Sequence, residues 1–496
     1  MNEIKVQNER DDSRARNRKA LESRGFDLFP ASGFHPRDRV ESLKSKYFVQ
    51  EDQDFEDRPP VRIAGRLYSL RPIGRAWFAD LRQAHERIQL YLSKSAVNED
   101  IWFLVNHLDI GDIVGVEGTL FRTRRGELTV AVRSIDCLCK PSTTPPIGKT
   151  DRAGVTHEAS SDTGSLLREH RHVKFMTDRN VFENIRHQAT VKQVVREKLT
   201  EKGFLEVDTS ILSRFYGGAS ATPFTTKSKA LGVNLYGRVA PEGDLKRLLV
   251  GGFDQVFEIG PNFRNEGIDA THQPVFQALE VYQSYADYRD MMNLTEELVT
   301  ACVKAVCGEL RLRVNGRVFD FTPPWPRFQM LDLVALELGL APDAVTYELM
   351  LEAWLQRCPG QDAPRTWGEI LVAIFEEYSE SQLLGPCFLL NHPLETSPLT
   401  KVCPEDSRLT ERFEAYLGGI EFANAYSELN DPVEQRRRLQ EQTIERDERY
   451  ALDEWFLTAM DDGLPQAGGL GIGIDRLVML LTGSSRISDV IAFPVS

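Results

Sequence analysis

Five short segments of alternating apolar and polar residues lie within residues 60–140, and they constrain the fold more than any other feature of the sequence. The segments are VRIAGRLYSL, RAWFADLR, ERIQLYLS, GDIVGVEGTLFRT and GELTVAVRSIDCL, and turn residues separate them. A period of two places successive side chains on opposite faces, so each segment predicts a strand. Five such strands in a short stretch predict a small barrel. The leading candidate is the OB-fold, a five-stranded barrel that binds oligonucleotides.

Changes in composition divide the rest of the chain. A charged helix is predicted over residues 9–24, where Gly25 is a natural stop. The segment after the barrel is rich in Pro, Gly, Ser and Thr, which is typical of a linker. The C-terminal strands do not lie in βαβ units, so we expect an α+β domain with an antiparallel sheet flanked by helices. The expected parts are a helical extension (1–58), the OB-fold (59–140), a linker (141–171) and the large domain (172–496).

Composition excludes several classes of protein. The net charge is -14, but nucleic-acid binding depends on local basic patches, and the chain has two, at 14–19 and 122–125. The 7 cysteines are scattered and form no C-x-x-C pair, which argues against a disulfide framework or a zinc site. No apolar run is long enough to cross a membrane, and the N-terminus lacks the apolar core of a signal peptide. We therefore expect a cytoplasmic protein that does not enter a membrane.

A first group of polar residues lies on two predicted strands, 253–264 and 276–285. Their sequences include FEIGPNFRNEG (257–267) and THQPVFQALEVY (271–282). Residues of one parity share one face of a strand. That face carries Glu258, Asn262, Arg264, Glu266, Phe276, Glu280 and Tyr282. A solvent-exposed sheet face is the alternative, but Phe276 lies among the charges and Arg264 suits bidentate contact with a phosphate or carboxylate, so we expect a binding floor.

A second group lies in RFEAYLGGIEFANAYSELND (412–431). A two-residue turn at Gly418-Gly419 would pair Tyr416 with Glu421. Glu414 and Glu421 then share a face and lie close enough to hold a hard cation such as Mg2+. Asn424 and Glu428 have the other parity, so a bulge or bend between 421 and 424 is needed to bring all four residues into one site. Any one of these acids alone would more simply be a surface residue.

A third group is GLGIGIDRLVMLLT (469–482), which passes from a glycine-rich strand to an apolar helix. The glycines allow a ligand or backbone to approach closely, and Arg476 lies in the first turn of the helix. This arrangement fits a nucleotide site at a helix N-terminus. The segment is not a P-loop, since it lacks G-x-x-x-x-G-K-[ST].

Together these groups resemble motifs 2 and 3 of the class II aminoacyl-tRNA synthetases, and in detail they resemble lysyl-tRNA synthetase. The resemblance extends from the barrel to the C-terminus and includes GGASATPF (217–224) and RVAPEGDLKRLLVGG (238–252). It implies a homodimer that activates L-lysine with ATP, uses several Mg2+ ions, and transfers lysine from lysyl-adenylate to tRNA(Lys). Attack on the α-phosphorus needs positioning and charge neutralisation, which Arg264, Arg476 and Mg2+ would supply.

The resemblance also implies roles, position by position. ATP would be bound by Arg264, Glu266, His272, Phe276 and Arg476. Mg2+ would be bound by Glu414 and Glu421. The amino acid would be bound by Gly217, Glu242, Glu280, Tyr282, Asn424 and Glu428. Glu242 would take the α-amino group, and Glu280 with Glu428 would pair with the ε-ammonium. The barrel would read the anticodon with Phe78, Gln89 and Glu127.

Several positions depart from the family pattern, although none is a core ligand. They are Gln273 and Val275 in the motif 2 loop, Gly243 and Asp244 in PEGDLK, Ser210 at the usual motif 1 proline, and Ser488 at a usual arginine. By parity Val275 faces away from Phe276 and Glu280, so we expect its substitution to spare adenylation. Together the departures suggest a divergent paralogue.

Three other interpretations compete with lysine–tRNA ligation. A paralogue could form an adenylate of another amino acid or serve a non-standard acceptor. A binding protein without activity is a second alternative, which the intact set of charged residues argues against. An aspartyl or asparaginyl enzyme would share the layout, but Glu280 and Glu428 would repel an acidic substrate.

Overall fold

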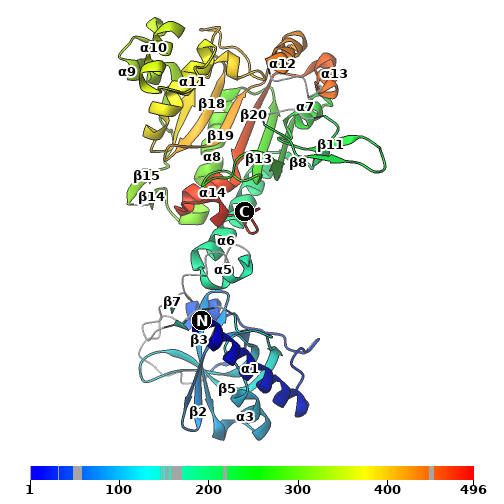
Figure 1. Ribbon diagram of the computed structural model, residues 1–496, viewed down its shortest axis with the longest axis vertical. Helices are drawn as coiled ribbons and strands as arrows, with labels where there is room; N and C mark the ends of the chain where they lie inside the picture. Colours follow the sequence, from blue (N-terminus) through cyan, green and yellow to red (C-terminus); the bar gives the residue numbers. More distant parts are fainter. Residues whose placement is uncertain are drawn as a thin grey trace. The chain divides into compact units, whose positions relative to one another are not determined.

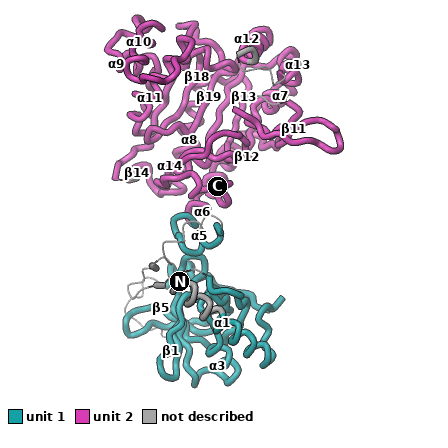
Figure 2. The backbone as a smooth tube through the Cα atoms, viewed as in Figure 1, with its two compact units in different colours: residues 1–182 teal, residues 183–496 magenta. Residues whose placement is uncertain are grey.

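The structure is a computed structural model that describes residues 2–31, 33–47, 58–145, 147, 149–150, 156–157, 170–215, 221–314, 316–445 and 452–495. The chain divides into two compact units, residues 1–182 and 183–496 (Figure 2). Within the described ranges, no helix combines the length and apolar character that a membrane crossing needs.

The first unit is built on a closed barrel of five strands in the order β1-β2-β3-β5-β4, which confirms the fold expected from the alternating segments. Its apolar alternate residues, among them Ile63, Leu67 and Val116, form a buried core. The elements are α1 (Asn2–Ser23), α2 (Val40–Tyr47), β1 (Pro60–Ile73), β2 (Ala76–Gln83), β3 (Glu86–Ser93), α3 (Glu99–Asn106), β4 (Ile113–Arg122), β5 (Leu128–Cys139), β6 (Lys149–Thr150), β7 (Thr156–His157), α5 (Arg171–Thr177) and the start of α6 (Arg179–Glu201).

A buried cluster of charges fastens α1 to the barrel. Asp112 is completely buried and accepts hydrogen bonds from Arg14 Nη1 at 2.7 Å and Lys140 Nζ at 2.7 Å. Lys140 is also completely buried, and its ammonium donates to Asp109 Oδ2 at 2.8 Å. Two carboxylates, Asp112 and Asp109, therefore balance two buried cations, and Asp112 contacts both of them. Removal of one partner from such a cluster costs more than the net contribution of the pairs, because it leaves a charge buried and unpaired.

We predict that Asp112→Ala lowers the free energy of opening of the barrel by about 3–5 kcal/mol, because buried Arg14 loses the carboxylate that it contacts and Lys140 keeps Asp109 alone of its two carboxylates. Amide hydrogen exchange of β1 and β4 in the full chain measures this change. Lys44→Ala is the matched control, since Lys44 is 46% exposed in its pair with Glu86 and such pairs contribute less than about 1 kcal/mol. Equal exchange in the two variants would contradict the prediction.

The second unit is an α+β domain around an eight-stranded sheet in the order β16-β17-β18-β19-β20-β13-β12-β8. Figure 1 shows β18, β19, β20 and β13 side by side at its centre. The strands of the second unit are β8 (Leu205–Glu206), β9 (Leu212–Ser213), β10 (Thr225–Lys227), β11 (Asn234–Gly237), β12 (Gln255–Phe263), β13 (Val275–Ser284), β14 (Arg311–Val314), β15 (Arg317–Asp320), β16 (Arg327–Gln329), β17 (Cys387–Leu390), β18 (Arg412–Leu417), β19 (Ile420–Ser427) and β20 (Ala467–Gly473). Of these, β9, β10 and β11 form a separate sheet, and so do β14 and β15. Its helices after α6 are α7 (Glu242–Val250), α8 (Tyr288–Cys307), α9 (Met330–Leu338), α10 (Tyr347–Arg357), α11 (Trp367–Tyr378), α12 (Pro432–Glu445), α13 (Glu454–Gly463) and α14 (Ile474–Thr482).

The two faces of this sheet have opposite character. Leu279, Val281, Leu470 and Ile472 point to one face and form the main core with apolar residues of α6, α8 and α14. Their neighbours of the other parity, such as Glu280, Gly469 and Gly471, lie on the second face and line a cavity. The central strands pair antiparallel as expected, whereas β16–β17 and β12–β8 at the two edges are parallel.

The hairpin β18–β19 confirms both the predicted turn and the predicted bulge. Gly418 and Gly419 have φ of 65° and 75°, which glycine adopts without strain. Tyr416 pairs with Glu421 as expected, but Ala415 pairs with Ala423, so the strand carries Phe422 as an extra residue. The two-for-one step restores the parity after it, and Glu414 pairs with Asn424. Acids before the bulge and the amide after it therefore reach the same face.

One feature of the first expected strand pair is wrong. β12 ends at Phe263, opposite the first residue of β13, so Arg264 and Glu266 lie in the loop beyond the strand. Of these two residues, Arg264 still bonds through its backbone to the segment that leads into β13: its N–H donates to Pro274 O at 2.9 Å. β12 ends at Phe263 because its partner β13 begins opposite it, at Val275. The alternation of residues in β12 alone does not reveal this limit.

Candidate active site

One cavity of about 1210 Å³ gathers most of the polar residues that the sequence singles out. It lies on the second face of the sheet, and residues of α7 and α13 also line it. Those of the predicted residues that line it are Glu242, Asn262, Arg264, Glu266, His272, Phe276, Glu280, Tyr282, Glu414, Glu421, Asn424 and Arg476. Glu258 is elsewhere, because its buried carboxylate pairs with Arg238.

The floor of the cavity is the glycine-rich strand β20, which lies between β13 and β19. Gly471 pairs with Glu280 on one side and Asn424 on the other. Gly469 pairs in the same way with Tyr282 and Tyr426. The two rows place functional side chains on both sides of a strand that carries none on this face. The glycines therefore create the space into which the flanking side chains converge.

Two carboxylates and two phenols line one end of the cavity. Glu242 Oε1 accepts hydrogen bonds from the Tyr426 hydroxyl at 2.6 Å and from Lys246 Nζ at 2.6 Å. Glu280 Oε2 accepts a bond of 3.3 Å from the Tyr282 hydroxyl. Burial, followed by the nearby carboxylate of Glu242, raises the pKa of Glu280 to about 8. This end of the cavity therefore favours a ligand that brings positive charge.

Glu428, which we expected to pair with the ε-ammonium together with Glu280, is not among the residues that line the cavity. It is completely buried, and its Oε2 forms an ion pair with Lys246. Its other oxygen, Oε1, lies against Gly469, where a Cβ atom would overlap it. The sequence pattern predicted the correct face of β19. It did not reveal the ion pair between Glu428 and Lys246 of α7.

The other end of the cavity carries arginines. The Arg264 guanidinium lies over the Phe276 ring at 5.1 Å, and its Nε is buried without a hydrogen-bond partner among the described residues. Arg476 donates to Glu421 Oε2 at 3.1 Å, and its Nη2 lies 2.8 Å from His272 Nε2. Glu266 Oε1 accepts from Thr222 N at 3.3 Å. An aromatic ring beside two guanidinium groups suits a base and the phosphates of a nucleotide.

Glu414 and Glu421 line the cavity beside Arg412 and Arg476 and fit a hard cation. Arg412 Nη2 and the Tyr416 hydroxyl donate to Glu414 at 2.7 Å and 2.8 Å. Burial and the Glu414 carboxylate raise the pKa of Glu421, so the pair is under electrostatic stress that a cation relieves. Among the described residues, no group of three or more acidic, His or Cys side chains could hold a metal by itself. Two carboxylates completed by phosphate oxygens is the usual arrangement for Mg2+.

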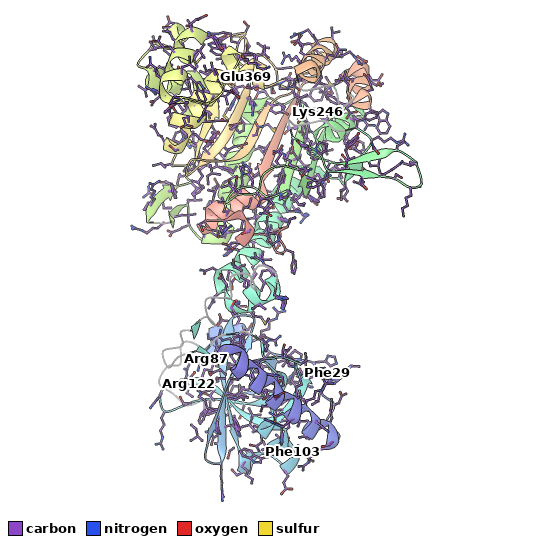
Figure 3. All side chains as sticks on the ribbon, in the orientation of Figure 1. Phe29, Arg87, Phe103, Arg122, Lys246 and Glu369 are labelled. Atoms are coloured by element: carbon purple, nitrogen blue, oxygen red, sulfur yellow. The ribbon has the colours of Figure 1, made fainter. Side chains whose placement is uncertain are left out.

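The three residues expected to contact an anticodon lie together on the barrel. Phe78 pairs with Tyr91 across β2–β3, and their rings lie 5.0 Å apart. Gln89 Nε2 donates to Glu127 Oε2 at 3.1 Å, and Arg87, labelled in Figure 3, pairs with Glu127 at 2.7 Å. The barrel therefore presents aromatic rings beside hydrogen-bonding groups, which suits unstacked bases.

The departures from the family pattern fall in different surroundings. Gly243 lines the cavity beside Glu242, whereas the Asp244 carboxylate pairs with Arg247 at 2.8 Å. Gln273 also lines the cavity, and Val275 pairs with Phe263 at the start of β13. Ser210 donates to Leu212 O at 2.6 Å, and Ser488 lies in a short 3-10 turn, Ile487–Asp489. Gly217 lies outside the described residues.

Three residues of the site were missed from the sequence. Lys246 lies four residues after Glu242 on α7, a spacing that places two side chains on one helix face. Arg412 shares parity with Glu414, and it also donates to Asn424 Oδ1 at 3.0 Å. Tyr426 lies between Asn424 and Glu428 on the same face of β19. In each case the spacing was a usable signal in the sequence.

Comparison with known proteins agrees with this geometry. Residues 164–496 match the family described as tRNA synthetases class II (D, K and N), and residues 61–138 match the OB-fold nucleic acid binding domain. The fold and site are thus those of a class II aminoacyl-tRNA synthetase.

Similar curated proteins narrow the family. The lysine–tRNA ligase of Pelotomaculum thermopropionicum is 42% identical over 97% of this chain and 94% of its own length. That of Dehalococcoides mccartyi is 40% identical over 96% and 94%, and that of Methanoculleus marisnigri is 41% identical over 96% and 92%. The chain belongs to the lysine–tRNA ligase family.

We predict that affinity for L-lysine rises between pH 6 and about pH 8, by up to about tenfold per pH unit. The reason is that Glu280, with its pKa raised to about 8, is mostly protonated in the empty site at neutral pH and must ionise to pair with an ammonium. Above that pH it is already ionised, so the dependence flattens. Calorimetry in two buffers of different ionisation enthalpy should show proton release at pH 7. Glu280→Gln removes the release, and an affinity independent of pH would contradict the assignment.

We also predict that Gly469→Ala abolishes lysine binding or lowers the melting temperature, because its methyl group would overlap Glu428 Oε1 and press on the Tyr282 ring. Gly471→Ala should be milder, since the nearest oxygen of Glu280 is 3.3 Å from the added carbon. Gly385→Ala is the control, because nothing lies within 4 Å of its Cβ position. Parent-like binding and melting of Gly469→Ala would show that this strand is not the floor of the site.

Proposed function

We propose that this chain is a lysine–tRNA ligase that forms lysyl-adenylate from L-lysine and ATP and transfers lysine to tRNA(Lys). The observation that carries the proposal is the distribution of charge in this cavity. Glu242 and Glu280 line it beside the phenols of Tyr426 and Tyr282. Arg264 and Arg476 line it beside Phe276 and His272, and Glu414 and Glu421 line it as well. A diamino acid and a nucleoside triphosphate have the complementary charges. The names of its similar relatives support the same substrate.

Residues of this chain act mainly by positioning and by balancing charge. Glu242 binds the α-ammonium of lysine. The residues that surround the side-chain end are Glu280, Tyr282, Asn424 and Glu428. Gly217, outside the described residues, belongs to the same proposed subsite. The lysine carboxylate attacks the α-phosphorus, a new O–P bond forms, and the bond to the pyrophosphate breaks. A ribose hydroxyl of tRNA then attacks the carbonyl carbon, and AMP leaves.

The nucleotide is held by the arginine end of the cavity. Phe276 stacks on the adenine, with Glu266 and His272 beside it. Arg264 binds the α-phosphate and the substrate carboxylate, and it stabilises the charge that develops during attack. Arg476 binds the outer phosphates as pyrophosphate leaves. Glu414 and Glu421 hold Mg2+, which neutralises phosphate charge when bound.

The barrel, residues 59–140, is the proposed anticodon-binding domain, and residues 172–496 are the proposed catalytic domain. Phe78 stacks on an anticodon base, and Gln89 and Glu127 contact base edges. The rings of Tyr91 and Phe121 continue from Phe78, with centroids 6.0 Å apart. Stacking on such rings contributes about 1–3 kcal/mol per base.

We also propose a homodimer in the cytoplasm. Exposed apolar side chains gather on β8, β9 and the β10–β11 hairpin and the residues beside them, which suits an interface. They are Leu205, Ile211, Leu212, Phe224, Leu231 and Val233. The seven cysteines are all free, as in proteins of a reducing compartment.

Amino-acid-dependent ATP–pyrophosphate exchange tests the proposal. Across the twenty amino acids we expect the strongest signal with lysine, followed by charging of tRNA(Lys). A stronger exchange signal with a neutral or acidic amino acid than with lysine would refute the lysine pocket. Gly243, which lines the cavity next to Glu242, favours one second candidate, a relative of lysine loaded onto a different acceptor. Ornithine and β-lysine belong in the same assay, and exchange without tRNA charging would support this candidate.

A further inference from the structure

The guanidinium of Arg412 joins three parts of the cavity wall. Arg412 is the first residue of β18, and its side chain lines the cavity. Its Nη2 donates to Glu414 Oε1 at 2.7 Å, and its Nε donates to Asn424 Oδ1 at 3.0 Å. Its Nη1 donates to Ser397 Oγ at 2.9 Å and to Thr396 O at 3.3 Å. The reaction as proposed gives this arginine no role.

The pairing of β18 with β19 brings these groups together. Glu414 pairs directly with Asn424, and Arg412 pairs with Tyr426 two positions along the hairpin (Figure 1). Residues two apart on a strand share one face, so Arg412 and Glu414 lie on the same side of the sheet. Arg412 is then the diagonal neighbour of Asn424, which a long side chain can reach. Strand register therefore places one guanidinium beside both a metal carboxylate and an amide of the amino-acid subsite.

Two donors fix the plane of the Glu414 carboxylate. Arg412 holds Oε1, and the Tyr416 hydroxyl donates to Oε2 at 2.8 Å. Each carboxylate oxygen keeps a second lone pair, so both bonds leave room for a cation. The carboxylate is therefore oriented before the cation binds. Without the bond from Arg412, Glu414 could turn about its side-chain torsions while Tyr416 follows.

The same guanidinium fixes the Asn424 amide. Arginine carries only donors, so it holds the oxygen of the amide toward itself. Its third nitrogen is anchored on Ser397, whose side chain is buried. A planar fork that is engaged at three nitrogens cannot turn toward one partner without loss of its bonds to the others. The positions of Glu414 and Asn424 therefore depend on one side chain.

We infer that Arg412 is a positioning residue for the reaction, which orients Glu414 for Mg2+ and Asn424 for the amino acid through the geometry of its fork. The inference rests on the proposed function, since it takes Glu414 as a metal ligand and Asn424 as part of the lysine subsite. The competing explanation is that Arg412 acts only by its charge, as a counter-ion to the nearby acids. Geometry and charge are separable by substitution.

Arg412→Lys keeps the charge but has a single nitrogen, which cannot reach all three partners. We expect the dissociation constant of lysine, measured by calorimetry, to rise at least about tenfold, as does the Mg2+ concentration for half-maximal exchange, because charge-assisted hydrogen bonds are lost. We expect kcat to fall about 10²-fold, the effect of a misplacement of about 1 Å. Arg408→Lys is the matched control, since Arg408 is 45% exposed in a pair with Asp406. Parent-like values for Arg412→Lys would overturn the inference.

Arg412→Ala tests the same point by chemical rescue. Because Arg412 lines the cavity, its removal leaves space that a small cation can enter from the ligand side. Methylguanidinium should restore part of the lysine affinity and of the exchange rate. Methylammonium at the same concentration and ionic strength carries the charge without the fork and should not. A response to both salts or to neither would overturn the inference.

Double variants show whether Arg412 acts through its two partners. With Asn424→Ala in place, Arg412→Lys should change the dissociation constant of lysine by less than about twofold. With Glu414→Gln in place, it should not weaken Mn2+ binding further. That binding is measured by electron paramagnetic resonance with α,β-methylene-ATP, which cannot form the adenylate. Additive effects in both pairs would mean that Arg412 acts independently, and the inference would fail.

A merely structural role and a wrong substrate have their own signatures. If Arg412→Lys lowers the melting temperature but leaves kcat and lysine affinity unchanged, Arg412 supports only the fold and the inference is overturned. If the parent prefers an amino acid other than lysine, the proposed substrate fails, and the Mn2+ measurement still decides whether Arg412 positions Glu414. If the parent prefers lysine and Arg412→Lys behaves like it, only the inference about Arg412 fails.

Discussion

The backbone pairing of β20 between β13 and β19 is the interaction on which the site depends. Hydrogen bonding fixes the rows Glu280–Gly471–Asn424 and Tyr282–Gly469–Tyr426, so no side-chain preference is needed to bring these groups together. The apolar residues of the same strands face α8 and α14 and hold the sheet in place. Burial of apolar side chains on one face therefore stabilises a sheet whose second face is open and polar. The ligand site is a consequence of strand register more than of any single side-chain contact.

Much of this arrangement follows from local patterns in the sequence. Alternation in residues 60–140 predicted the barrel, and the Gly418-Gly419 turn fixed the hairpin register and required the bulge near Phe422. The end of β12 could not be predicted in the same way, because it depends on where its partner starts. The partner of Glu428 was also hidden, because Lys246 lies on a helix far away in sequence. Contacts between distant elements are where local periodicity stops being informative.

In this acidic chain, charged side chains of opposite sign gather in different places. In the cavity, Arg264 lies over Phe276 and Arg476 lies beside His272, whereas the acids Glu242 and Glu280 lie beside phenols. The net charge of -14 therefore says little about the potential that a nucleotide or an amino acid meets. In the first unit, by contrast, one buried acid, Asp112, lies between two buried cations, Arg14 and Lys140. Each unit thus carries buried charges of its own.

The extra residue at Phe422 has a consequence for how this segment can evolve. It separates two stretches of β19 that would otherwise point their functional residues to opposite sides of the sheet. Glu421 and Asn424 are three positions apart, so regular pairing of the same sequence without the bulge would send them to opposite faces. Loss of the extra residue would leave them two positions apart, which a regular strand also directs to one face. The spacing of these two residues and the bulge can therefore change only together.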